Sequence, residues 1–178
     1  MTISKKTRKI LDDWRIGGFA VDISQDAVLI TATPATLSLT GYADGDCIGT
    51  KLTFTNAARA AGGSGIVNSA MLYDLNNQGV GIELALFDTD PSGTTFTDNA
   101  ALDIVDADMP KLMGFIAVDT FSAFSDTQLG IPTPGDTISL PFKCASTTRD
   151  IYGVMVGTAA ATYTATADLG VRLGIVQL

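Results

Sequence analysis

Apolar and polar residues alternate along much of this chain with a period of two, the period of a β-strand that buries one face. The clearest case is residues 80–86, where every even-numbered position is apolar. Residues 66–75 form another apolar run, and residues 76–79 between the two runs are turn-forming. The pattern therefore predicts a β-hairpin over residues 66–86 with one buried face.

Similar apolar runs, separated by loops rich in Gly, Pro, Thr and Asp, predict the other strands. In the last run, residues 169–176, every odd-numbered position is Leu, Val or Ile. Residues 57–65 are small and Gly-rich and predict a loop, and residues 121–130 are expected to be irregular. The remaining predicted strands span residues 19–23, 27–31, 51–55, 114–118, 137–142 and 151–156.

Roughly eight or nine short strands with almost no helix predict an all-β protein. The expected architecture is an antiparallel β-sandwich, and a jelly roll is one form of it that fits the strand number. A chain of 178 residues suits one domain. We therefore expect one sandwich domain over residues 16–178, preceded by an extended or short-helical N-terminal arm over residues 1–15.

The charge of the chain divides between these two parts. Residues 1–15 hold five basic and two acidic residues, a net charge of +3, whereas residues 16–178 hold six basic and 17 acidic residues, a net charge of −11. A basic arm on an acidic body is suited to attachment to another surface. The acidic body would repel phosphates, so nucleic acid is not an expected partner.

Within the arm, Ile10, Leu11 and Trp14 would share one face of a short helix. Trp14 is the one tryptophan of the chain, and it would anchor the arm either on its own body or in a partner's pocket. We expect docking on a protein partner, with a solvated terminus as the alternative. The candidate partner-binding residues are Lys5, Lys6, Arg8, Lys9, Ile10, Leu11, Trp14 and Arg15.

No secretory signal or membrane segment is expected, because the arm has no apolar core and no run approaches the ~20 apolar residues of a transmembrane helix. The chain also has no histidine. This excludes the Ser-His-Asp and Cys-His mechanisms and zinc held by histidine. Cys47 and Cys144 have no metal-binding spacing, and we expect two buried, reduced thiols, although a disulfide between them stays open.

Residues 87–108 are rich in Asp, Thr and Pro and predict a long excursion from the sheet, followed by a short helix over residues 106–113 with Asp106 or Asp108 as its cap. Clustered carboxylates suit Ca²⁺, but the spacing is not that of an EF-hand loop. Roles in turns and caps are the simpler expectation, so no metal or cofactor is assigned. The acidic residues of this segment are Asp88, Asp90, Asp98, Asp103, Asp106 and Asp108.

Paired carboxylates also occur in glycosidases, but aromatic residues make up only 7% of the chain. The aromatic platform of a sugar site is therefore not expected, and no enzymatic activity is assigned. A carbohydrate-binding β-sandwich module remains an alternative.

Several segments resemble small β-rich virion structural proteins of tailed bacteriophages, of the capsid decoration (cement) type. The resemblance covers about residues 45–178 and does not include the arm. It rests on residues 52–67 (LTFTNAARAAGGSGIV), 84–101 (LALFDTDPSGTTFTDNAA), 106–108 (DAD), 152–156 (YGVMV) and 163–174 (YTATADLGVRLG).

The resemblance implies a protein without enzymatic activity that is made in the host cytoplasm and sits on the outer capsid surface of the virion. Its expected partner is the major capsid protein, and its role would be head stabilisation. Symmetric sites on an icosahedral shell favour a homo-oligomer, with a trimer preferred. Another virion component (neck, tail or fibre protein) is the alternative within the same class.

Overall fold

The structure is a computed structural model, in which residues 26–135 and 138–178 are described. The strand predicted over residues 19–23 and the arm over residues 1–15 lie outside the described residues. The described part contains ten strands and one 3₁₀ turn, η1. Their bounds are β1 (Asp26–Ala32), β2 (Cys47–Phe54), β3 (Ser64–Asp74), β4 (Ile82–Phe87), η1 (Met109–Lys111), β5 (Leu112–Val118), β6 (Thr120–Phe124), β7 (Thr127–Ile131), β8 (Leu140–Lys143), β9 (Ile151–Gly157) and β10 (Leu169–Gln177).

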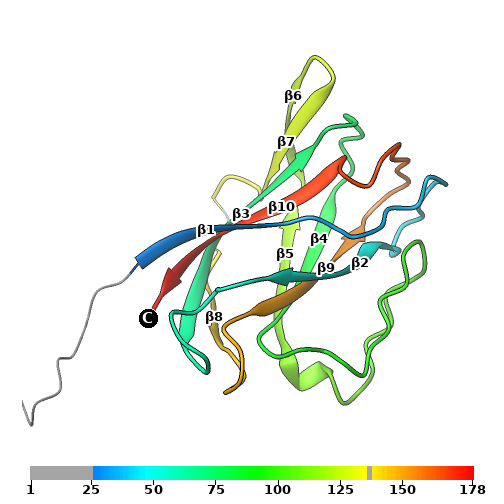
Figure 1. Cartoon of the computed structure of the whole chain (residues 1–178). Coiled ribbons are helices and arrows are strands. Elements are labelled where there is room, and N and C mark those ends of the chain that lie inside the picture. The colour runs from blue at the N-terminus through cyan, green and yellow to red at the C-terminus, as the bar shows by residue number, and fades with distance from the viewer. Residues whose placement is uncertain (1–25, 136–137) are drawn as a thin grey trace, which may run out of the picture.

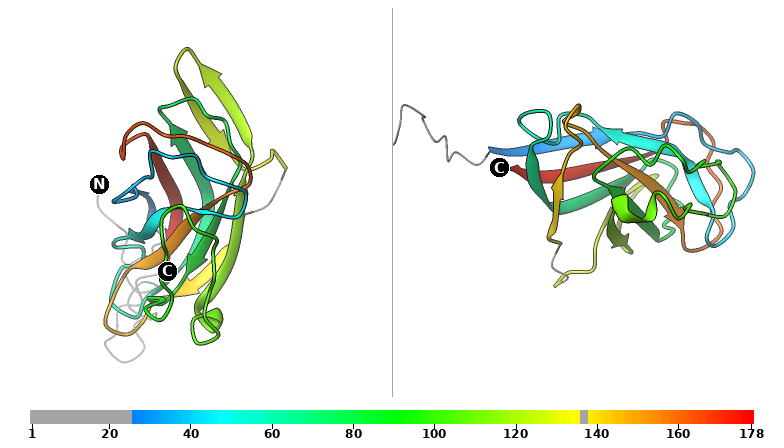
Figure 2. Two further views of the ribbon diagram at one scale, coloured as in Figure 1. Left: turned by 90° about the vertical axis from the view of Figure 1, so that its right-hand side faces the viewer. Right: turned by 90° about the horizontal axis from the view of Figure 1, so that it is seen from below.

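The strands form two antiparallel sheets that pack against each other, as Figures 1 and 2 show. The larger sheet has the order β1-β10-β3-β7-β6, and β8 pairs with the same edge of β3 as β7 does. The smaller sheet has the order β2-β9-β4-β5. The prediction of an all-β antiparallel sandwich is therefore confirmed. Within the described residues, no helix has the length and apolarity needed to cross a bilayer.

The strand pairs are nested, which defines the sandwich as a jelly roll. β1 pairs with β10, β2 with β9, β3 with β8, and β4 with β5. This is the pairing of one long hairpin rolled up so that its two arms wrap around a common core. The β6–β7 hairpin is inserted between β5 and β8, and it extends the larger sheet.

The hairpin predicted over residues 66–86 is wrong, although both of its strands exist. β3 belongs to the larger sheet and β4 to the smaller one, so residues 75–81 carry the chain between layers. Asp74 shapes this crossing: its buried carboxylate accepts hydrogen bonds from the backbone N–H groups of Asn76, Gln78 and Gly79 at 2.7–3.1 Å. Alternation reveals which face of a strand is buried, but not which strand lies beside it.

The expectation of irregular structure over residues 121–130 is also wrong. These residues form most of the β6–β7 hairpin, which projects from the body in Figure 1. The sequence gives no alternation there because three of the five residues of β6 are exposed and none is buried. In contrast, the alternation predicted for residues 169–176 is confirmed, since the four odd-numbered side chains are all at most 2% exposed.

The main core lies between the inner faces of the two sheets and contains Leu72, Ile82, Leu84, Ile116 and Leu173. Leu84 is completely buried, as are Leu86 and Ile151. Removing a fully buried leucine from water contributes roughly 1.5–3 kcal/mol to folding, so this inner layer is the main source of stability.

We expect Leu84→Ala to lower the free energy of unfolding by about 2–5 kcal/mol, because the substitution leaves a cavity between the sheets. Urea unfolding followed by circular dichroism measures this loss. The matched control is Leu39→Ala, since the Leu39 side chain is 64% exposed and its loss should change stability by less than about 0.5 kcal/mol. Equal losses for the two variants would contradict this assignment of the core.

Candidate interaction surface

The arm residues predicted to bind a partner, residues 5–15, lie outside the described residues. The structure does show where the preceding chain joins the body. Asp26, the first residue of β1, pairs with Gln177 at the end of β10. The carboxylate of Asp26 accepts a hydrogen bond from Arg59 at 3.0 Å. The described chain thus begins at one end of the larger sheet, at its edge strand β1 (Figure 1).

The segment 88–108 covers the outer face of the smaller sheet. A second apolar cluster forms there, in which Phe96 of this segment packs on Phe87 of β4 with ring centroids 5.9 Å apart. Leu102 and Ile104 also pack against this cluster. The segment predicted as an excursion is therefore a cover, and its apolar residues close a sheet face that would otherwise be exposed.

Asp98 fastens this cover to the body. Its Oδ1 accepts a hydrogen bond from the Tyr42 hydroxyl and another from the Gly49 backbone N–H, both at 2.7 Å. Burial and the hydrogen bond to Asp98 raise the pKa of Tyr42. Gly49 has φ +79°, and a Cβ there would collide with Pro34, so this position requires glycine. Its N–H donates to Asp98 within the stretch from Ile48 to Leu52 where the register of β2 with β9 is interrupted.

Asp108 fastens the other end of the cover. The helix predicted over residues 106–113 is only the three-residue turn η1, since residues 112 and 113 belong to β5. Asp108, one of the two predicted caps, stands at the cap position of η1, but its side chain makes no cap hydrogen bond. It accepts hydrogen bonds from Lys111 Nζ at 2.6 Å and from the Thr94 hydroxyl at 2.8 Å. The Lys111 hydrogen bond lowers the pKa of Asp108 and, together with Thr94, outweighs the effect of burial.

These contacts favour the structural role over the calcium site for the carboxylates of residues 88–108. Asp90 pairs with Lys51, while Asp98 and Asp108 accept hydrogen bonds from amide, hydroxyl and ammonium groups. In the parts of the chain that the structure describes, no three His, Cys, Asp or Glu side chains form a group that could hold a metal ion.

Because the pKa of Asp108 is lowered on folding, its charge stabilises the native state above the ordinary pKa of about 4, and this contribution is lost as the pH falls through the lower native value. We expect Asp108→Asn to be less stable than the wild type at pH 7, with a difference that shrinks at pH 2–3. Urea unfolding at both pH values measures it. A difference that is independent of pH would show that the charge of Asp108 does not stabilise the fold.

Both cysteines are buried and neither forms a disulfide, which confirms the predicted thiols. They lie apart: Cys47 belongs to the cluster beneath the cover, and Cys144 to the main core. Burial raises the pKa of each thiol to about 11. A thiol with this pKa is almost entirely protonated at neutral pH, so it is a weak nucleophile.

We expect neither cysteine of the native protein to react with Ellman's reagent within minutes at pH 8, since both are at most 3% exposed and protonated. In 6 M guanidinium chloride both should react, giving two equivalents per chain. Absorbance at 412 nm follows the release of thionitrobenzoate. Rapid labelling of the native protein would contradict this placement of the thiols.

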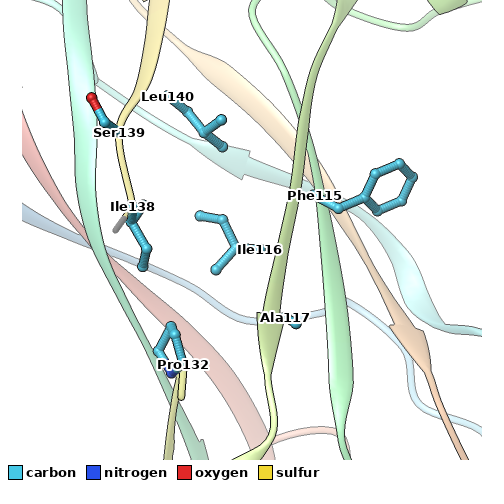
Figure 3. A pocket seen from close by; sticks show the side chains of 7 residues that line it. All are labelled: Phe115, Ile116, Ala117, Pro132, Ile138, Ser139 and Leu140. Atoms are coloured by element: carbon cyan, nitrogen blue, oxygen red, sulfur yellow. The ribbon is translucent and has the colours of Figure 1, made fainter. Parts of the chain in front are cut away.

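A hollow with mostly apolar lining side chains opens between the edge strand β5 and the segment leading into β8 (Figure 3). Ile116, Ile138 and Leu140 line it, whereas the ring of Phe115 points away from them. Among its described lining residues, Ser139 is the one with a polar side chain. The described residues thus present in this hollow neither the inward-facing aromatic ring nor the set of hydrogen-bonding groups that a sugar site combines.

The outer face of the larger sheet is unlike that of the smaller one, because no described segment covers it. The register places Leu29 of β1, Met71 and Tyr73 of β3, and Ile131 of β7 on this side. We call this surface the open face. Its side chains belong to residues Ala27, Leu29, Thr31, Ser64, Ile66, Ser69, Met71, Tyr73, Thr120, Ser122, Phe124, Thr127, Leu129, Ile131, Pro141, Lys143, Arg172 and Val176.

The open face contains no carboxylate, and its two charged side chains are the cations Arg172 and Lys143. This is unusual on a chain with a net charge of −8. Two glycines of β10 keep the face flat. Tyr73 lies over Gly170, where a Cβ would collide with the tyrosine ring, and Ser69 lies over Gly174, where a Cβ would collide with the serine hydroxyl. Leu29 is 72% exposed and Ile131 is 36% exposed. These features suit contact with another protein.

No protein-family model and no curated protein matches this chain. The candidate site is therefore defined by the geometry of the chain itself. The open face escaped prediction from the sequence, although a signal for it exists. The outward positions of residues 169–176 are Gly170, Arg172, Gly174 and Val176, which include no acidic residue.

Proposed function

We propose that this protein is a non-enzymatic virion structural protein, a decoration protein that binds the outer surface of a tailed bacteriophage's major capsid protein lattice and stabilises the head. The observation that carries this proposal is the open face, a carboxylate-free surface with exposed apolar side chains on an acidic body. The sequence resemblance over residues 45–178 supplies the class of partner. Localisation on the virion follows from the same proposal.

The charge distribution supports attachment through the open face. Acidic residues elsewhere on the body keep separate copies of the protein in solution and repel other acidic surfaces. The open face has no such repulsion, and it can bury Ile131, Met71 and Tyr73 against a partner. Arg172 and Lys143 can meet carboxylates at the rim of the contact, which adds specificity.

The basic arm can bind the same lattice as the open face. Residues 16–25 connect it along the chain to β1, which is itself a strand of that face. Residues 1–25, if fully extended, span at most about 80–90 Å from Asp26. Two linked contacts on one surface, the arm and the open face, raise the overall affinity even when each contact alone is weak. Many copies of the protein bound to one shell would together resist separation of the capsomers.

The fold also accords with this role, since jelly rolls occur in viral capsid domains. They occur in lectins too, so the fold alone does not choose between a virion protein and a carbohydrate-binding module. The open face favours the virion protein, because a broad smooth surface fits another protein better than it fits a sugar.

The test measures binding of the full-length protein to purified capsids that lack it. Ile131→Glu should weaken binding at least tenfold, because it places an unpaired charge in the contact. Val105→Glu is the matched control, since Val105 is 39% exposed, against 36% for Ile131, but lies on the cover of the opposite sheet. Co-sedimentation with capsids over a range of protein concentrations gives the dissociation constants.

A protein that starts at residue 16 should lose capsid binding while its circular dichroism spectrum stays that of a β-sandwich. Equal binding by the Ile131→Glu and Val105→Glu variants would remove the open face from the mechanism. Binding to isolated tails or necks instead of capsids would identify another virion component. Specific binding in a glycan array, with none to capsids, would favour the carbohydrate-binding module.

A further inference from the structure

β1 is an edge strand, and no described segment pairs with its free hydrogen-bonding edge. Along its other edge it pairs with β10 through all seven residues without a break, from Asp26 with Gln177 to Ala32 with Val171. Its sequence, DAVLITA, contains no Pro and no Lys. Proteins usually protect an exposed edge with a bulge, a proline, a lysine or a very short strand, and β1 has none of these.

Most of the other edge strands are protected in one of these ways. β8 has four residues and contains Pro141 and Lys143. β6 has neither a proline nor a lysine and keeps its register, but with five residues it offers a shorter edge than the seven residues of β1. The register of β2 is interrupted between Ile48 and Leu52, and that of β5 shifts where it pairs with Leu86 and Phe87. β1 is therefore the strand of the described fold that is best suited to pairing with another chain, and its best match in a second copy is β1 itself.

We propose that β1 pairs with β1 of a second copy of this chain, in the antiparallel direction and about a two-fold axis at Leu29. Leu29 points outward from the sheet and is 72% exposed, the highest value among the large apolar side chains of the described residues. In this arrangement the two Leu29 side chains lie directly opposite each other, and each covers the other.

The remaining cross-strand pairs are also compatible. Val28 would lie opposite Ile30 of the second copy, and Ala27 opposite Thr31, which are favourable neighbours in a sheet. Asp26 is the one charged residue of β1, it is already paired with Arg59, and it would face Ala32. No like charges meet in this register, so the strand is complementary to itself, as a two-fold interface requires.

Pairing of this kind would join the two larger sheets into one. Side chains directly opposite each other in an antiparallel pair project from the same side of the sheet. The open faces of the two copies would therefore lie side by side and point in the same direction. The inference does not depend on capsid binding, because it concerns the purified protein alone.

Sedimentation velocity of the full-length protein tests the pairing. The wild type should form a dimer, and Leu29→Lys and Leu29→Glu should each raise the dissociation constant at least tenfold, because like charges would meet across the axis. An equimolar mixture of these two variants should restore a mixed dimer, since Lys would then lie opposite Glu. Leu39→Lys is the matched control: Leu39 is 64% exposed in the loop between β1 and β2, and its substitution should leave the dimer intact.

Three results would overturn the pairing. The first is a wild type that is monomeric, as would follow if residues 19–23 of the same chain covered β1. The second is the trimer expected from capsid symmetry. The third is a dimer that neither Leu29 variant weakens, or that the mixture fails to restore. Circular dichroism of both variants confirms that each still folds.

Discussion

A β-sheet has two faces, and a two-layer sandwich buries only one face of each sheet. This constraint organises the whole molecule. The inner faces share a core that includes Leu84 and Leu173. The outer face of the smaller sheet is also apolar, and residues 88–108 close it through Phe96. Asp98 and Asp108 hold that cover in place. The larger sheet keeps its outer face uncovered by any described segment, and its surface chemistry differs accordingly.

The sequence predicts which residues form strands better than it predicts how the strands pair. Alternation identified β4 and β10, and a continuous apolar run identified β9, which is buried on both faces. Alternation could not reveal that β3 and β4 lie in different layers, since the crossing depends on Asp74 and on a hydrogen bond from Gln128, 54 residues away. The β6–β7 hairpin left no pattern because β6 has no buried residue.

The site was only partly predictable for a similar reason. The abundance of aspartate indicated turns and caps, and Asp98 and Asp108 do hold backbone and side-chain donors. However, the contact between Asp98 and Tyr42 joins residues 56 positions apart, which no local pattern encodes. The open face is assembled from strands distant in sequence, so its lack of carboxylates is evident only once the register is known. The arm residues were chosen from charge and from the helical spacing of Ile10, Leu11 and Trp14, and their role remains a prediction.

The nested pairing of the jelly roll has a consequence for synthesis on the ribosome. β10 is the last of the described strands, yet it lies between β1 and β3 in the larger sheet. Until residues 169–177 have been translated, β1 lacks its partner along its whole length and β3 lacks the neighbour that pairs with it from Gly65 to Asp74. A nascent chain therefore exposes these two apolar strands until residues 169–177 have been made, and during that time the strands are open to aggregation or to binding by a chaperone.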